Sequence, residues 1–126
     1  MARIVIADDS KEVRERLVQT LGEAGHQVES VIDGVGALEK AKEGNLDLLI
    51  VDCFMPLSGI EVIRTIREDP AYSAVNDLRI IGITDMAQEG EIRSFTDLGA
   101  DGAWEKKLDS AQGIPSLLDL IEKVLS

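Results

Sequence analysis

The chain has 126 residues, the size of one ordinary domain, and 44% of them are hydrophobic, which is enough for a single core. Aromatic residues make up only 3%, so we expect an aliphatic core, and the formal net charge of −11 argues against nucleic-acid binding by this domain. The single cysteine, Cys53, excludes an internal disulfide, and no apolar run is long enough to cross a membrane, so we expect a cytoplasmic domain without a membrane segment.

Five short aliphatic runs predict five strands. The third is the most informative, because Leu48 to Val51 are four apolar residues in a row, as expected for a strand that is covered on both faces. This run ends at Asp52, where either an ordinary turn or a binding site begins. The predicted strands are residues 4–7, 26–32, 46–52, 79–83 and 100–105.

Helical patterns fill the segments between these runs. Ser10 is a suitable cap for the first helix, Asp85 and Gln88 can form a capping box for the fourth, and Pro115 can open the last. The predicted helices are residues 11–21, 37–42, 59–67, 85–98 and 115–125, and residues 71–77 are predicted to be a polar loop. Strands that alternate with helices in this way predict a parallel sheet with helices on both faces.

Four of the predicted strands end in polar side chains. Asp8 and Asp9 follow the first strand, Asp52 ends the third, Thr84 the fourth and Lys106 the fifth. The carboxyl ends of parallel strands share one edge of the sheet, so these side chains are expected to face one crevice. Crowded carboxylates repel one another unless a cation joins them, and Mg²⁺ prefers such oxygen ligands. Each residue alone has an ordinary structural explanation, but their joint position at strand ends favours phosphoryl chemistry with a carboxylate nucleophile.

These residues and the motifs around them resemble the receiver domain of bacterial two-component response regulators, over nearly the whole chain and close in size to the stand-alone chemotaxis type. The matching motifs are Asp8-Asp9 after the first strand, Asp52 followed by Met55-Pro56 and Gly59, Ile83-Thr84, and Gly99-Ala100-Asp101-Gly102 leading to Lys106. The resemblance implies one receiver domain over residues 1–126. It also implies a flavodoxin-like three-layer α/β/α fold, with a five-stranded parallel sheet of order 2-1-3-4-5 and five helices.

The resemblance further implies that Asp52 accepts a phosphoryl group from a sensor histidine kinase or phosphotransfer protein, while Thr84 and Lys106 bind the phosphoryl oxygens. The implied Mg²⁺ ligands are Asp9 and Asp52 directly, Asp8 through water, and the backbone carbonyl of Phe54. The chain would then be a signalling switch, not an enzyme, that promotes only its own phosphorylation and dephosphorylation. An unknown output partner is expected to bind the 85–99 helix together with the last strand and helix.

Three positions depart from the family pattern. Lys107 stands where receivers usually have a proline, and Ala103 stands where they have the switch aromatic. Trp104 is next to Ala103 but should point to the other side of the strand. Asp85 adds a further acid directly after Thr84, and we favour helix capping as its role, although it could also slow or bias phosphorylation.

Three other functions compete with a phosphorylation-dependent switch. A receiver-like interaction module that works without phosphorylation is favoured by Ala103 and Lys107. It is opposed by the intact acids, threonine and lysine at the strand ends. A phosphatase of the haloacid dehalogenase type would need a second aspartate two residues after Asp52, and position 54 is Phe. A flavin-binding protein of this fold would have a hydroxyl-rich phosphate loop in place of Asp8-Asp9. The sequence therefore favours a phosphorylation-dependent switch.

Overall fold

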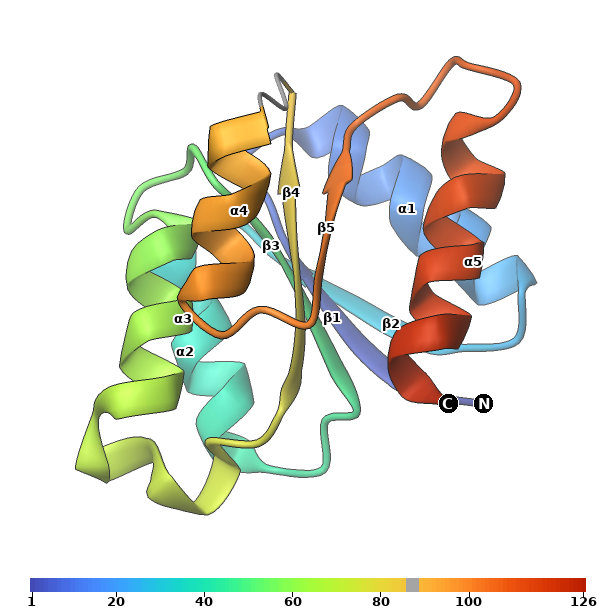
Figure 1. The fold of residues 1–126 in the computed structure, drawn as a ribbon. Coiled ribbons are helices and arrows are strands. Elements are labelled where there is room, and N and C mark those ends of the chain that lie inside the picture. Colours follow the sequence, from blue (N-terminus) through green and yellow to red (C-terminus); the bar gives the residue numbers. More distant parts are fainter. Residues whose placement is uncertain (86–88) are drawn as a thin grey trace.

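The computed structural model describes residues 1–85 and 89–126, and the side chains of residues 1–85 and 93–126. In these parts of the chain five strands alternate with five α-helices, and a 3-10 helix, η1 (Pro70–Val75), precedes the fourth strand (Figure 1). The strands are β1 (Arg3–Ala7), β2 (Gln27–Val31), β3 (Leu48–Asp52), β4 (Arg79–Thr84) and β5 (Gly102–Glu105). The helices are α1 (Lys11–Glu23), α2 (Gly34–Glu43), α3 (Gly59–Glu68), α4 (Glu89–Asp97) and α5 (Gly113–Leu125). No helix in the described ranges is both long and apolar enough to cross a membrane.

The strands form one parallel sheet in the order β2-β1-β3-β4-β5, which confirms the predicted topology. β3 lies in the middle, and all five of its residues are buried, as its continuous apolar run predicts. β2 is an edge strand with no buried residue, which explains its weak apolar pattern. The register pairs Asp52 with Ile83 and Thr84 with Glu105, so the ends of β3, β4 and β5 meet at one edge of the sheet.

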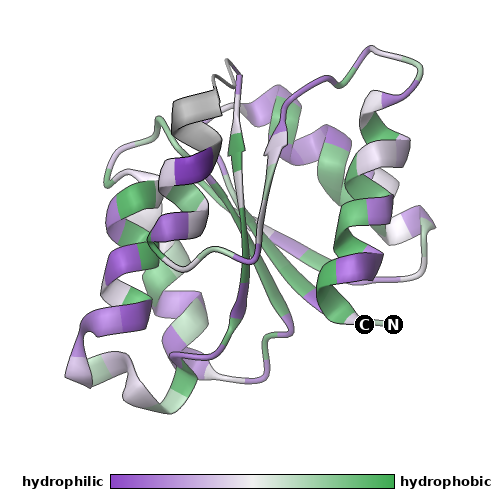
Figure 2. Ribbon diagram, viewed as in Figure 1, coloured by the Kyte–Doolittle hydropathy of each residue, from purple (hydrophilic) through white to green (hydrophobic). Residues whose placement is uncertain are grey.

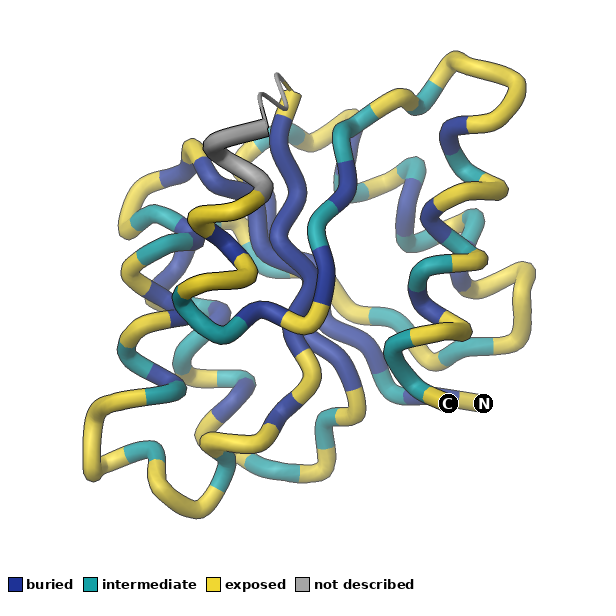
Figure 3. Tube along the Cα trace, in the orientation of Figure 1, coloured by how far each residue is buried: buried dark blue, intermediate teal, exposed yellow. Residues whose placement is uncertain are grey.

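Each face of the sheet is covered by its own layer of helices, with α1 and α5 on one face and α2, α3 and α4 on the other (Figure 1). Side chains alternate between the faces, so Ile81 and Ile83 belong to the core under α1 and α5, whereas Ile80 belongs to the core under α2, α3 and α4. The central strands β1, β3 and β4 form the mostly hydrophobic centre in Figure 2 and the mostly buried centre in Figure 3. The predicted aliphatic core is confirmed, because Phe95 and Trp104 are the only aromatic side chains in it among the described residues.

Two segments are more helical than the sequence predicts. α2 begins at Gly34, not at residue 37, because the side chain of Asp33 accepts a hydrogen bond from Gly36 N–H at 2.9 Å and caps the helix earlier. The prediction of a loop over residues 71–77 is wrong for most of that segment, which forms η1. Asp69 caps this 3-10 turn by accepting a hydrogen bond from Ala71 N–H at 2.9 Å.

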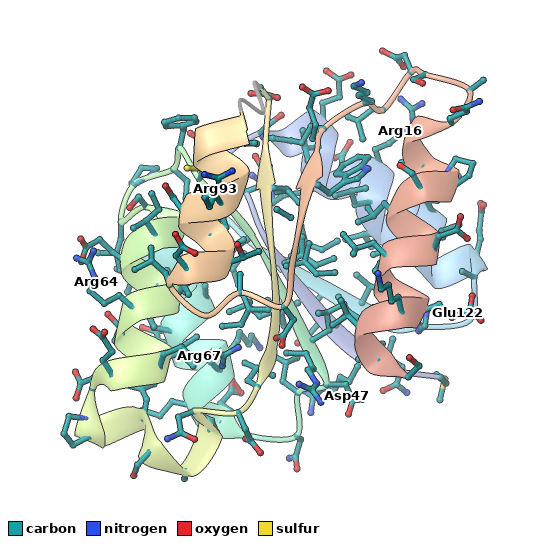
Figure 4. All side chains as sticks on the ribbon, in the orientation of Figure 1. Arg16, Asp47, Arg64, Arg67, Arg93 and Glu122 are labelled. Carbon is teal, nitrogen blue, oxygen red and sulfur yellow. The ribbon has the colours of Figure 1, made fainter. Side chains whose placement is uncertain are left out.

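The last helix also begins earlier than predicted, at Gly113 and not at Pro115. A Cβ at position 113 would collide with the carbonyl oxygen of Lys107, so glycine allows the start of α5 to lie directly against the loop that follows β5. The same loop is held from the other side by Arg16 of α1, whose guanidinium donates to the Leu108 carbonyl at 2.9 Å (Figure 4). This loop follows β5 and Lys106, so these contacts hold the chain just after the C-terminal end of β5.

The described part of α4 is held near its C-terminal end. Phe95 is the only buried side chain in the described part of this helix. Arg67 of α3 donates to the carbonyl of Gly99 at 2.9 Å and so clamps the turn that follows α4 (Figure 4). Gly99 has a φ of 109°, a left-handed conformation that favours glycine and ends the helix. Two predicted features of this helix, the capping contribution of Gln88 and the apolar contact of Ile92, lie outside the described residues.

Candidate functional site

Three acidic side chains converge at the C-terminal edge of the sheet. Asp8 and Asp9 follow β1, Asp52 ends β3, and one carboxylate oxygen from each lies within 4.8 Å of the others. Asp8 and Asp52 are buried, whereas Asp9 is exposed. Mg²⁺ is a small cation that takes oxygen ligands, usually from one or two carboxylates together with water. The predicted acids therefore come together as a group of oxygen ligands that could hold a small divalent cation.

Lys106 lies between the two buried acids. Its Nζ is 2.9 Å from Asp8 Oδ2 and 3.2 Å from Asp52 Oδ1, and its side chain is only 4% exposed. Its backbone N–H donates to the Thr84 carbonyl at 2.8 Å, which continues the β4–β5 pairing up to the site. The peptide bond to Lys107 is trans. The predicted lysine is therefore in place without the proline that usually follows it.

Local hydrogen bonds orient Asp8. Its Oδ1 accepts a hydrogen bond from the backbone N–H of Ser10 at 2.9 Å, and its carbonyl accepts one from the Arg14 guanidinium at 2.9 Å. Ser10 in turn caps α1, as predicted, by accepting from Val13 N–H. Sequence reasoning missed Arg14, because an exposed-looking arginine on a helix gives no sign that it reaches back to the preceding strand.

Asp52 is oriented by the turn that follows β3. Its Oδ1 accepts a hydrogen bond from the backbone N–H of Phe54 at 3.4 Å, while the Phe54 ring is exposed. A Cβ at position 59 would lie 2.5 Å from the Asp52 carbonyl oxygen, so Gly59 is needed for α3 to begin this close to the strand. The predicted role of the Phe54 carbonyl as a metal ligand stays a prediction.

The site carries an excess of negative charge. Burial raises the pKa of Asp52 above its ordinary value, and the charge of Asp8 raises it further. Lys106 and the Phe54 amide oppose this rise without cancelling it. Burial by itself lowers the pKa of Lys106, but the hydrogen bond with Asp8 and the charges of Asp52, Asp8 and Asp85 outweigh burial and raise it. The lysine therefore stays cationic, and the carboxylates are stabilised by any further cation.

Thr84 is fully buried at the end of β4, and its Oγ1 has no hydrogen-bond partner among the described residues. A buried hydroxyl without a partner costs about 1–3 kcal/mol, and such groups are rare in folded proteins. A ligand oxygen at this edge of the sheet would satisfy this hydroxyl. Thr84 was predicted as a site residue, and its unpaired oxygen supports that prediction.

An aromatic ring from α4 occupies the sheet surface near Ala103. A Cβ at Gly82 would lie 2.5–2.7 Å from three ring atoms of Phe95, so the ring rests directly on this glycine. Gly82 pairs with Ala103 on β5, and these two small residues form the floor beneath the ring. Trp104 points to the opposite face, as predicted, and its indole N–H donates to Ser116 Oγ at 3.0 Å. The sequence showed that position 103 has no aromatic ring. It did not show that Phe95 of α4 places a ring beside that position.

Asp85 faces the site. Its Oδ1 is 3.6 Å from Lys106 Nζ, so this lysine contacts a third carboxylate. The sequence favoured helix capping for Asp85 and raised an effect on phosphorylation only as a second possibility. Gln88 of the predicted capping box lies outside the described residues, and the contact with Lys106 links Asp85 electrostatically to the site.

Comparison with known proteins agrees with this geometry. The family model described as the response regulator receiver domain matches residues 4–117. The response regulators MprA of Mycobacterium ulcerans (strain Agy99) and Mycobacterium leprae (strain TN) are each 39% identical over 100 residues, which is 79% of this chain. The match covers 41% and 42% of those relatives, so the chain spans about two-fifths of their length.

Solved structures agree over nearly the whole chain. The chemotaxis response regulator CheY4 of Vibrio cholerae superposes with a TM-score of 0.82 at 29% identity, covering 99% of both chains. The response regulator TrrA of Thermotoga maritima, solved in complex with Mg²⁺ and BeF, superposes with a TM-score of 0.82 at 32% identity, covering 99% of this chain and 100% of that one. With its strand order, its edge of acids and lysine, and a family match over most of its length, this chain belongs to the response regulator receiver domain family.

Proposed function

We propose that Asp52 accepts a phosphoryl group from a phosphohistidine on a sensor histidine kinase or phosphotransfer protein, and that this phosphorylation switches the binding of an output partner. The observation that carries the proposal is the buried Asp52 carboxylate, which has Lys106 Nζ at 3.2 Å and two further acids beside it. Membership of a family whose proteins act as phosphoacceptors in two-component systems supports it. In this proposal residues 1–126 form one receiver domain, acting as a switch and not as an enzyme on other substrates.

The transfer needs little beyond positioning and charge neutralisation. A carboxylate oxygen of Asp52 forms a bond to phosphorus, the bond from phosphorus to the imidazole nitrogen breaks, and the electron pair leaves with the imidazole. Lys106 donates hydrogen bonds to the phosphoryl oxygens, and the unpaired hydroxyl of Thr84 becomes satisfied by another. The raised pKa of Lys106 keeps its ammonium protonated for this role.

The acids also suit a magnesium ion, which neutralises phosphoryl charge when bound. In this proposal Asp9 and Asp52 hold it directly, Asp8 through water, and the Phe54 carbonyl provides a further oxygen. The three carboxylate oxygens within 4.8 Å of one another and the raised pKa of Asp52 both support a need for a cation here.

The surroundings of the site support a protein as donor. The first residue of α2 and the loop after β3 are joined by a hydrogen bond from Gly34 N–H to the Pro56 carbonyl at 3.0 Å. Four exposed large apolar side chains lie on the loop before α2, on the first turn of α2 and on the loop after β3, namely Ile32, Val35, Phe54 and Leu57. We propose that the output partner binds residues 85–99 together with β5 and α5. We also propose a cytoplasmic location, which a chain with a single cysteine suits.

Acetyl phosphate with Mg²⁺ tests the proposal. Intact-mass analysis should show one acid-stable, base-labile phosphoryl group on the wild type. Asp52→Asn keeps the side-chain shape but removes the nucleophile, so it should abolish the label. Asp119→Asn on the exposed side of α5 removes the same charge away from the site and should be labelled like the wild type. A label that survives in Asp52→Asn would show that Asp52 is not the acceptor.

The same experiment decides the alternative function. If the wild type is labelled neither by acetyl phosphate nor by a phosphorylated phosphotransfer protein, the chain works as an interaction module that does not need phosphate. The unusual Ala103 and Lys107 are the residues that favour this alternative.

A further inference from the structure

Lys106 has as many carboxylate partners as it has hydrogens to donate. An ammonium group carries three N–H donors. In the part of the chain that the structure describes, its Nζ lies 2.9 Å from Asp8, 3.2 Å from Asp52 and 3.6 Å from Asp85. A phosphoryl oxygen on Asp52 needs one of these donors, so one present partner has to give way.

Asp85 is the partner most easily displaced. Asp8 and Asp52 are buried, and an unpaired buried carboxylate is strongly disfavoured. Asp85 has the longest of the three distances, and its side chain is 74% exposed, so water can solvate it as soon as it leaves. The Asp85 carboxylate also lies at the exposed side of the site, where its charge repels an incoming anion as long as Asp85 stays on Lys106.

We propose that Asp85 occupies, in the unphosphorylated protein, the place on the Lys106 ammonium that a phosphoryl oxygen takes after transfer, and that it thereby selects against highly charged small phosphoryl donors. This inference rests on the proposed function, because it concerns access to the same Asp52. Asp85 acts through Lys106 and is therefore a positioning residue that also determines donor specificity.

Two small donors of different charge separate this role from a general effect on the fold. Acetyl phosphate is a dianion near neutral pH, and phosphoramidate is a monoanion. In both reactions an Asp52 oxygen bonds to phosphorus. The bond to the leaving group then breaks, and acetate leaves with the electron pair, or ammonia leaves after its nitrogen has taken up a proton. The donors differ in leaving group as well as in charge, but each leaving group is the same for the wild type and the variant. The gain measured for each donor relative to the wild type therefore reports the charge that must pass Asp85.

Asp85→Asn keeps the shape of the side chain and removes its charge. Unit charges about 5 Å apart in water interact strongly enough to change a rate about fourfold, so the variant should react about fourfold faster with phosphoramidate and about sixteenfold faster with acetyl phosphate. The gain should shrink in high salt. Asp109→Asn is the matched control, because Asp109 is an exposed acid on the loop after Lys106 that pairs with Arg16 instead. It should leave the ratio of the two rates unchanged.

A second measurement follows the contact itself. The Lys106 ¹⁵Nζ resonance should differ between the wild type and Asp85→Asn in the free protein. The two proteins should become alike with Mg²⁺ and beryllofluoride, because Asp85 has by then left the ammonium. The inference is overturned if the resonances differ equally in both states, or if both donors gain the same factor. Absence of any label on wild-type Asp52 would instead refute the proposed function, and this inference with it.

Discussion

Magnesium should stabilise this protein against unfolding, because it relieves the repulsion within the acid cluster. Asp8, Asp9 and Asp52 bring three carboxylates within 4.8 Å of one another, and Lys106 offsets one of these charges. Two unit charges 4.8 Å apart repel by at least about 0.9 kcal/mol in water and about 3.5 kcal/mol at an effective dielectric constant of 20. A divalent cation replaces this repulsion with attraction in the folded state only.

The expected shift follows from mass action. With Mg²⁺ at ten times its Kd, the folded state gains RT ln 11, or about 1.4 kcal/mol. A domain of this size changes its Tm by about 4 °C for each kcal/mol, so the Tm should rise by about 6 °C. Asp9→Asn removes one ligand and should cancel nearly all of this rise. Because it also relieves repulsion, it should raise the Tm measured in the presence of EDTA.

Thermal unfolding followed by circular dichroism, with and without MgCl₂ at matched ionic strength, measures both effects. Asp119→Asn provides the control, since it removes one exposed acid from α5 and should keep the full Mg²⁺ shift. An unchanged wild-type Tm in Mg²⁺ would refute the site, and so would equal Mg²⁺ shifts in Asp9→Asn and Asp119→Asn.

Two further predictions concern stability. The pKa of Asp52 is raised in the folded state, so between about pH 3.9 and that pKa the folded protein keeps a proton that the unfolded chain releases. Rising pH therefore lowers the free energy of unfolding across that window. Asp52→Asn should therefore unfold at higher urea than the wild type at pH 7 in EDTA, with the gap closing below about pH 4, and a gap that persists unchanged there would contradict the charge argument. Ala103→Tyr should lower the Tm by about 4–12 °C, because the added ring competes with Phe95 for the floor at Gly82, and overpacking costs about 1–3 kcal/mol. Phe95→Ala by itself also destabilises, but the double variant Ala103→Tyr with Phe95→Ala should lose less than the sum of the two single losses. Purely additive losses would show that the two rings do not share this space.

The sequence alone determined the sheet and which polar side chains meet at its C-terminal edge. Leu48 to Val51 are apolar without interruption because β3 is covered on both faces, and that pattern is local in the sequence. Once the strands are parallel, residues at their C-terminal ends must meet at one edge. Asp52 and Lys106 could therefore be placed together although 53 residues separate them.

Tertiary structure alone decided the contacts that depend on close approach between elements. Phe95 reads as one apolar position on a polar helix, and only the docking of α4 shows that its ring rests on Gly82 beside Ala103. Asp85 reads equally well as a helix cap, and only its position 3.6 Å from Lys106 connects it with the site. Periodicity reports which face of an element is buried, but not which side chain on another element meets it. That meeting depends on the distances and angles at which α4, β4 and β5 pack.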